Sequence, residues 1–248
     1  MLNKKSTLFL LVCLSLLTIV KAQNHGWVWV KGDLTGSQVY GTMGTPDPLN
    51  NAGSQWDPAE WTDTMGNFWI FSGFTGFTNA LWKFEPATNN WTWMKGDDPF
   101  NTTSTTPGEA IYGLQGIPAP DNTPGFKHYS GASWTDKKGD LWMFGGNALG
   151  GGLLNEMWRY HIATNEWTWM RGNNTTGIYG TKGVADPSND PPPRYGTSCT
   201  WVDNQGYLWL FGGSGNDVDM TGTIYNDLWK YNTITNEWTW VSGESVPN

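Results

Sequence analysis

The stretch Trp134-Thr-Asp-Lys-Lys-Gly-Asp-Leu-Trp-Met-Phe-Gly-Gly146 decides the fold, because it recurs without a gap at residues 61–73 and 201–213. Each copy contains an Asp-x-x-Gly sequence, in which Asp can bond to the turn backbone and Gly can supply a positive φ. The run Leu141–Phe144 that follows is apolar at every position, which is typical of a strand covered on both faces. Each copy therefore predicts a β-hairpin.

Two further blocks follow each hairpin in a constant order. The first of them has the pattern Asn-x-x-Trp and occurs as Asn79–Phe84, Asn155–Tyr160 and Asn226–Tyr231. A Thr-Asn turn then leads to a Trp-Thr-Trp strand, which begins at Trp91, Trp167 and Trp238. The two tryptophans of that strand are two residues apart and share one face, so we expect them to pack against a neighbouring sheet. Each unit therefore predicts four antiparallel strands.

This order of an apolar strand ending in Phe-Gly-Gly (Phe144–Gly146 and Phe211–Gly213), then Asn-x-x-Trp-x-Tyr, then Trp on the next strand resembles the kelch repeat. The resemblance covers nearly all of residues 56–243. It implies an all-β fold of the kelch β-propeller family, to which the central domain of galactose oxidase belongs, with four-stranded blades at about 56–96, 128–172 and 195–243. The first unit departs from the pattern, with Ser54-Gln55 where the third has Arg194-Tyr195.

A fourth copy of the last strand, Trp27–Val30, stands alone before the first unit, so we expect a lone N-terminal strand. Three blades are too few for an ordinary propeller ring, and residues 243–248 resemble the start of another inter-blade linker. We therefore expect a partial propeller from a longer secreted protein. The alternative is that two such arcs assemble into one ring.

The inter-blade linkers share a Tyr-Gly motif, at Tyr40, Tyr112 and Tyr179, followed by residues rich in Pro and Asn. Insertions on one face of a repeat array often form its binding face. Because this motif recurs in every unit, we favour structural packing over binding for the linkers.

The first 22 residues predict a cleaved signal peptide, because Lys4 and Lys5 precede an apolar run from Leu8 to Val20 and a small-residue site at Ala22. A retained membrane anchor is the alternative, but the run is shorter than a spanning helix needs. The mature chain, residues 23–248, is therefore expected outside the cytoplasm, secreted or at the cell surface, without a membrane span.

Charge and cysteine content restrict the partners and the chemistry. Removal of the three leader lysines leaves 11 basic and 22 acidic residues, a net charge of −11, which argues against a nucleic-acid partner. Cys199 is then the only cysteine, so no internal disulfide can form. We expect Cys199 to be a small buried apolar residue.

We expect no catalytic residue, no metal and no cofactor. His25, His128 and His161 lack metal-ligand spacing, and no nucleophile-elbow, phosphate-loop or Cys-x-x-Cys motif is present. The copper site that galactose oxidase would suggest has no matching residues. A loop with Asp217 and Asp219 begins like a calcium loop, but its twelfth position is Leu228, so a solvated loop is favoured.

We expect a secreted, non-catalytic binding module that recognises a protein or a glycan through its blade loops. The alternative is an exported kelch-type enzyme, an oxidase or a sugar hydrolase or isomerase, with a site completed by missing blades. Non-repeated aromatic residues could form a binding platform, although packing is the other interpretation. The candidate binding residues are Trp56, Phe74, Phe77, Asp217, Asp219 and Tyr225.

Overall fold

The computed structural model describes residues 26–73, 77–100, 108–148, 150–172, 176–196, 199–215 and 223–245. The predicted signal peptide, residues 1–22, lies outside these ranges. The chain divides into two units, Met1–Val30 and Lys31–Asn248, and the strands all belong to the second.

The predicted lone strand at Trp27–Val30 is wrong, because residues 26–30 adopt no strand and the four side chains of this copy are exposed. A strand is defined by its hydrogen bonds to a neighbouring strand. The other copies of this motif pair with the Asn-x-x-Trp strand of their own unit, whereas residues 26–30 form no strand pairing among the described residues.

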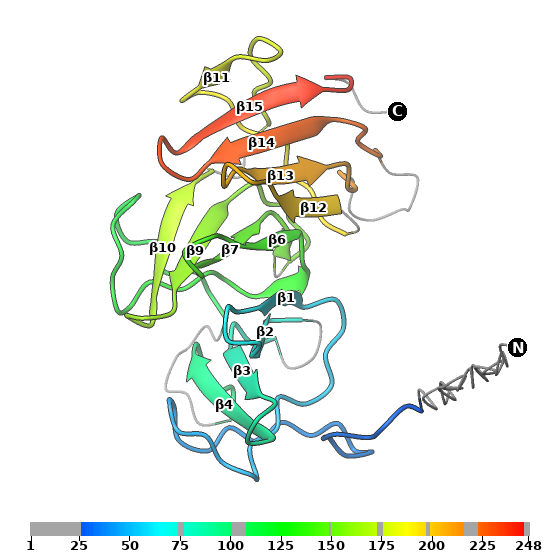
Figure 1. The fold of residues 1–248 in the computed structure, drawn as a ribbon, viewed down its shortest axis with the longest axis vertical. Coiled ribbons are helices and arrows are strands. Elements are labelled where there is room, and N and C mark those ends of the chain that lie inside the picture. Colours follow the sequence, from blue (N-terminus) through cyan, green and yellow to red (C-terminus); the bar gives the residue numbers. More distant parts are fainter. Residues whose placement is uncertain are drawn as a thin grey trace, which may run out of the picture. The chain divides into compact units, whose positions relative to one another are not determined.

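The described part of the second unit is all-β, and its three larger antiparallel sheets follow one another in chain order (Figure 1). The all-β prediction is confirmed, and each sheet contains the four expected strands in sequence order. The first sheet consists of β1 (Ala59–Thr62), β2 (Phe68–Phe71), β3 (Leu81–Glu85) and β4 (Asn90–Lys95). The second consists of β6 (Ala132–Thr135), β7 (Leu141–Phe144), β9 (Met157–His161) and β10 (Glu166–Arg171). The third consists of β12 (Cys199–Val202), β13 (Leu208–Phe211), β14 (Leu228–Asn232) and β15 (Glu237–Ser242), with β11 (Ala185–Asp186) added beside β15. Two short strands, β5 (Lys127–Tyr129) and β8 (Asn147–Ala148), form a separate two-stranded antiparallel sheet.

The predicted Asp-x-x-Gly turns close the first hairpin of every sheet. In the second sheet, Gly139 N donates to Asp136 O at 3.0 Å, and Asp136 Oδ1 accepts from the backbone N–H of Lys138 and Asp140. Asp136 Oδ2 accepts from Trp142 Nε1 at 2.9 Å. The same set of bonds recurs around Asp63 and Asp203. The turn carboxylate therefore fixes both the turn and the tryptophan of the second strand.

These turns predict a loss of stability in acid. Burial raises the pKa of Asp63, but hydrogen bonds from Trp69 and Asn67 outweigh it and hold the pKa below its ordinary 3.8. The pKa of Asp203 is lowered in the same way, with Trp209 as the main donor. A lowered folded pKa stabilises the fold above the unfolded value and ceases to do so as the pH falls through the folded value. Urea denaturation at about pH 6 and about pH 3 should show this loss, and Asp63→Asn and Asp203→Asn should make it smaller. An unchanged pH dependence in both variants would contradict the assignment.

Apolar faces join the sheets. Side chains of the first sheet, including Trp61 and Phe71, pack with Leu141, Trp158 and Trp167 of the second. A corresponding cluster joins the second sheet to the third. Strand β7 is consequently buried at all four positions, as its apolar sequence predicted.

Each linker lies along the outer edge of the sheet that follows it. The rings of Tyr40, Tyr112 and Tyr179 each lie 5.0–5.4 Å from a tryptophan of the third strand. In the third linker, Asn189 Nδ2 donates to Trp238 O at 3.0 Å, and Gly183 N donates to Trp240 O at 2.7 Å. Equivalent bonds hold the other two linkers. The packing interpretation of the linkers is confirmed, because they cover strand edges that would otherwise be open.

The glycine of the linker motif is required by a close approach. Gly180 has a φ of +63°, and a Cβ at this position would lie 2.1 Å from Asn189 Oδ1. Only glycine combines this backbone conformation with such a contact.

The expectation that Cys199 is buried is wrong, since its thiol is free and exposed. The equivalent residues, Ala59 and Ala132, are buried because the next sheet packs on them. No described sheet packs on this face of the third sheet.

Candidate functional site

The strand directions give every sheet two different ends. The tight turns after the first and third strands lie at one end, which we call the turn end. The linkers and the connections between the second and third strands lie at the other, which we call the loop end. The candidate binding residues that the structure describes lie at the loop end, and a pocket lies at the turn end.

Buried ion pairs hold the loop end of the second and third sheets. Arg194 binds Asp227 through two hydrogen bonds, at 2.7 and 2.8 Å, and both side chains are fully buried. Lys127 binds Glu156 at the equivalent place in the second sheet. Each pair ties the segment before the first strand to the start of the third strand, so both segments are rigidly placed.

The electrostatics of the two pairs follow from their burial. Burial raises the pKa of Asp227, but Arg194 outweighs it, so the pKa stays below its usual range. Tyr179 also donates to Asp227, at 2.7 Å, and burial together with this bond raises the pKa of Tyr179. Burial lowers the pKa of Lys127 even though Glu156 opposes the change. These groups are structural, because each is held by a partner inside the fold.

A row of aromatic side chains runs along the loop end. Phe77 lies 5.5 Å from Phe126, which lies 6.3 Å from His128. The row continues from His128 to Tyr129, at 4.6 Å, and from Tyr129 to Tyr195, at 5.5 Å. The last two ring pairs are inclined by only 33° and 34°, so their faces are roughly parallel. We call these five residues the aromatic row.

The structure places three of the predicted binding residues at this end. Phe77 is exposed at one end of the aromatic row, and Trp56 is exposed just before β1. The ring of Tyr225 lies under the Arg194 guanidinium at 4.2 Å and is half-buried, which makes it part of the ion-pair packing. Phe74, Asp217 and Asp219 lie outside the described residues.

Sequence reasoning missed Tyr129 and Tyr195 as candidate binding residues and did not place His128 among them. A signal for Tyr129 was present, because it stands five residues before the strand-one tryptophan, as Trp56 does. The ring contacts themselves join segments that are more than 60 residues apart, Tyr129 and Tyr195, and only the packed sheets reveal them.

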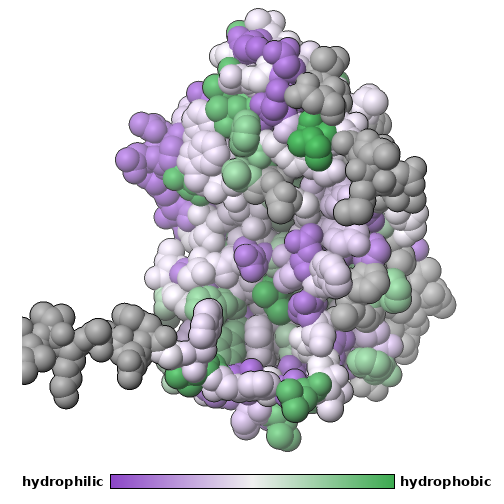
Figure 2. Space-filling model, turned by 90° about the vertical axis from the view of Figure 1, so that its right-hand side faces the viewer, coloured by the Kyte–Doolittle hydropathy of each residue, from purple (hydrophilic) through white to green (hydrophobic). Residues whose placement is uncertain are grey.

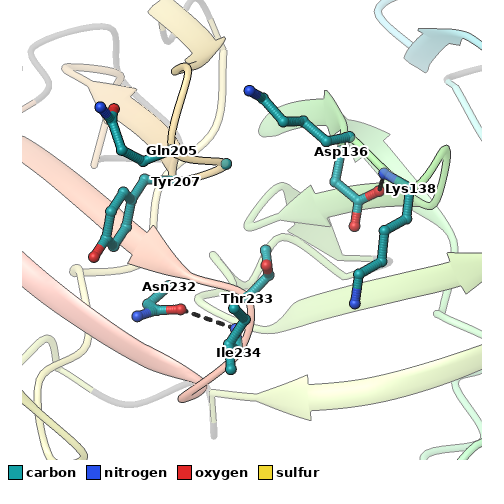
Figure 3. A pocket seen from close by; sticks show the side chains of 9 residues that line it. Asp136, Lys138, Gln205, Tyr207, Asn232, Thr233 and Ile234 are labelled. Carbon is teal, nitrogen blue, oxygen red and sulfur yellow. Dashed lines mark hydrogen bonds between the residues drawn. The ribbon is translucent and has the colours of Figure 1, made fainter.

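A pocket of about 280 Å³ lies at the turn end, between the second and third sheets (Figure 3). Its lining comes from the β6–β7, β12–β13 and β14–β15 turns, and Figure 3 shows the side chain of Lys138 beside it. Asn232 Oδ1 accepts from Ile234 N at 2.9 Å, and the Asp136 carboxylate is held by its own turn. The polar groups of this pocket therefore shape turns, and Lys138 could attract an anion.

The described residues contain no group of three or more His, Cys, Asp or Glu side chains arranged for a metal ion. The buried carboxylates of Asp63, Asp136, Asp227 and Glu156 are engaged in turns or ion pairs. Within the part of the chain that the structure describes, no helix is long and apolar enough to cross a membrane.

No protein-family model matches the chain. The Homo sapiens protein called Multiple epidermal growth factor-like domains protein 8 is 30% identical over 120 residues, which cover 48% of this chain and 4% of that protein. The Mus musculus protein of the same name is 31% identical over 99 residues, or 40% of this chain and 3% of that protein. The chain is thus similar to a short segment of these proteins and spans only a few per cent of their length.

Proposed function

We propose that this chain is a non-catalytic interaction module that binds a protein or a glycan through its loop end. The aromatic row carries this proposal through its exposed and half-buried rings, Phe77, His128, Tyr129 and Tyr195, while Phe126 is buried. Aromatic rings supply large contact areas with little conformational cost, and their faces also suit the apolar faces of sugars. The buried ion pairs beside the row would hold the binding surface in one conformation before the partner arrives.

We extend the proposal to the architecture of the three sheets and to the cellular location of the protein. We infer that the three sheets are blades of a kelch-type β-propeller, which the Phe-Gly-Gly and Asn-x-x-Trp motifs and the sheet-on-sheet packing support. We also infer that the chain works outside the cytoplasm as a secreted or cell-surface protein. The leader-like first 22 residues support this location, as do relatives whose name refers to epidermal growth factor-like domains.

The exposed surface suits a partner with mixed chemistry. Figure 2 shows hydrophobic side chains in separate patches between polar ones on one face of the molecule. A mixed surface of this kind is compatible with a soluble partner, because interfaces between such partners are about as apolar as the rest of the protein surface.

The test is a comparison of variants on a glycan array and on an array of purified extracellular proteins. We expect Trp56→Ala combined with Tyr129→Ala to lower the affinity for any bound partner by at least about tenfold, since central aromatic residues dominate binding energy. Lys138→Ala, at the turn end, is the matched control and should bind as the unmodified chain does. A partner that is lost with Lys138→Ala but retained by the loop-end variant would contradict the proposal.

A further inference from the structure

The third sheet exposes a face that its counterparts bury. Trp201 is 43% exposed, whereas Trp61 and Trp134, at the same position of the first and second sheets, are 5% and 3% exposed. Phe211 is also 43% exposed, and its counterparts, Phe71 and Phe144, are 0% and 1% exposed. The face of β12 and β13 that carries these two residues, which we call the tail face, is built like a sheet junction but lies open.

The first sheet exposes the opposite half of the same junction. Phe68 is 47% exposed, although its counterparts, Leu141 and Leu208, are completely buried. A pocket of about 320 Å³ opens here, and we call this surface of β1 and β2 the head face. Its lining residues are Glu60, Trp61, Thr62, Phe68, Trp69 and Ile70.

The two existing junctions show what such a pocket receives. The Trp61 side chain packs with Leu141 and Met143, the second-sheet counterparts of Phe68 and Ile70. Its indole Nε1 donates to Trp142 O at 2.8 Å, and Trp134 Nε1 donates to Trp209 O at the same distance in the next junction. The head-face pocket therefore occupies the position that accepts a strand-one tryptophan.

The third strand-one tryptophan is Trp201. Among the described residues, no acceptor is found for its indole Nε1, and its ring stacks on Trp209 of its own sheet at 5.5 Å. The head face offers the equivalent acceptor, Trp69 O. A second hydrogen bond crosses the first internal junction, where Thr135 Oγ1 of the second sheet donates to Thr62 O of the first at 2.9 Å. The equivalent bond in a new junction would join Thr62 Oγ1 to Val202 O.

We propose that the chain associates with a second copy of itself from head to tail, so that the tail face of one copy packs on the head face of the next. Trp201 enters the head-face pocket and donates its indole N–H to Trp69 O of the second copy. The Thr62 hydroxyl of the second copy donates to Val202 O. The second copy is the occupant because this chain carries both halves of the junction that it already uses twice internally.

This contact joins two different surfaces, so it is heterologous. Such contacts form closed rings when the rotation between copies closes and open chains when it does not. Every contact in either assembly would bury one tail face and one head face in the same way as the internal junctions, and a closed ring would leave no such face exposed. The inference is independent of what the loop end binds.

Sedimentation velocity of the full chain, produced by secretion, tests the association over a wide range of concentrations. We expect the unmodified chain to form dimers or longer assemblies. Phe211→Asp on the tail face and Phe68→Asp on the head face should each weaken the association by at least about tenfold, because each places a charge in an apolar junction. Ile234→Asp, at an exposed turn outside both faces, is the matched control and should assemble normally.

Mixing the two variants distinguishes a head-to-tail contact from a symmetric one. The Phe68→Asp chain keeps its tail face and the Phe211→Asp chain keeps its head face, so an equimolar mixture should form a one-to-one complex. A mixture that remains monomeric would exclude the proposed geometry. An unmodified chain that is monomeric at every concentration would show that a second copy is not the occupant.

Cys199 reports on the tail face directly. It is exposed in the single chain and stands where Ala59 and Ala132 are buried by the next sheet. Maleimide labelling, read by mass spectrometry of the Cys199 peptide, should slow as the concentration of the unmodified chain rises. The Phe68→Asp variant leaves the surroundings of Cys199 unchanged and should label rapidly at all concentrations. Equal labelling of the two proteins would overturn the proposal.

Discussion

The Arg194→Met variant is expected to lose about 3–5 kcal/mol of its free energy of unfolding, because it leaves a buried carboxylate without its cation. Asp227 receives two hydrogen bonds from Arg194 and one each from Tyr179 and Trp229. Without the guanidinium, burial would raise the pKa of Asp227 and the charged form would be strongly disfavoured. Urea denaturation followed by tryptophan fluorescence measures the loss.

The double variant Arg194→Met, Asp227→Leu is the control for that experiment. It removes both charges, so we expect it to be more stable than Arg194→Met alone, with a clear coupling energy between the two sites. The first sheet already lacks the pair, since Ser54 and Ala80 occupy the equivalent positions. A double variant no more stable than the single one would show that packing, rather than the unpaired charge, accounts for the loss.

Trp134→Ala is expected to cost about 3–5 kcal/mol of unfolding free energy, the usual range for a large aromatic residue removed from a core. Trp134 is 3% exposed in the cluster between the second and third sheets, and its indole donates to Trp209 O. The variant loses both the packing and this hydrogen bond. Chemical denaturation at low protein concentration gives the value for the single chain.

Trp201→Ala is the matched control, because Trp201 occupies the same position of the repeat and is 43% exposed. At low concentration it should cost less than half as much as Trp134→Ala, because much of its ring already contacts water. At high concentration its effect should grow if Trp201 becomes buried in the proposed assembly. Equal losses for the two variants at low concentration would contradict the burial difference.

Much of the local structure could be predicted from the repeat alone. The sequence predicted the Asp-x-x-Gly and Thr-Asn turns, the apolar run Leu141–Phe144 and the order of the four strands. These features depend on residues that are neighbours in the chain, so they can be recognised in the sequence itself. The packing role of the linkers was also readable, because the Tyr-Gly motif recurs in every unit.

The candidate site was less accessible to sequence reasoning. Trp56 and Phe77 were identified because they do not repeat, and they are exposed at the loop end. Tyr129 and Tyr195 were missed because their ring contact crosses from one sheet to the next. A repeat in the sequence shows which residue departs from the pattern, but it does not show which residue, far away in the sequence, lies beside it in the fold.

The repeated sequence by itself determined that Trp61, Trp134 and Trp201 stand at equivalent positions of three equivalent hairpins. Only the tertiary structure decided that two of these tryptophans are buried and the third is exposed. The same holds for Cys199, which the sequence predicted to be buried and the structure exposes. The physical reason is that burial depends on the sheet that packs against a residue, and identical repeats have different neighbours.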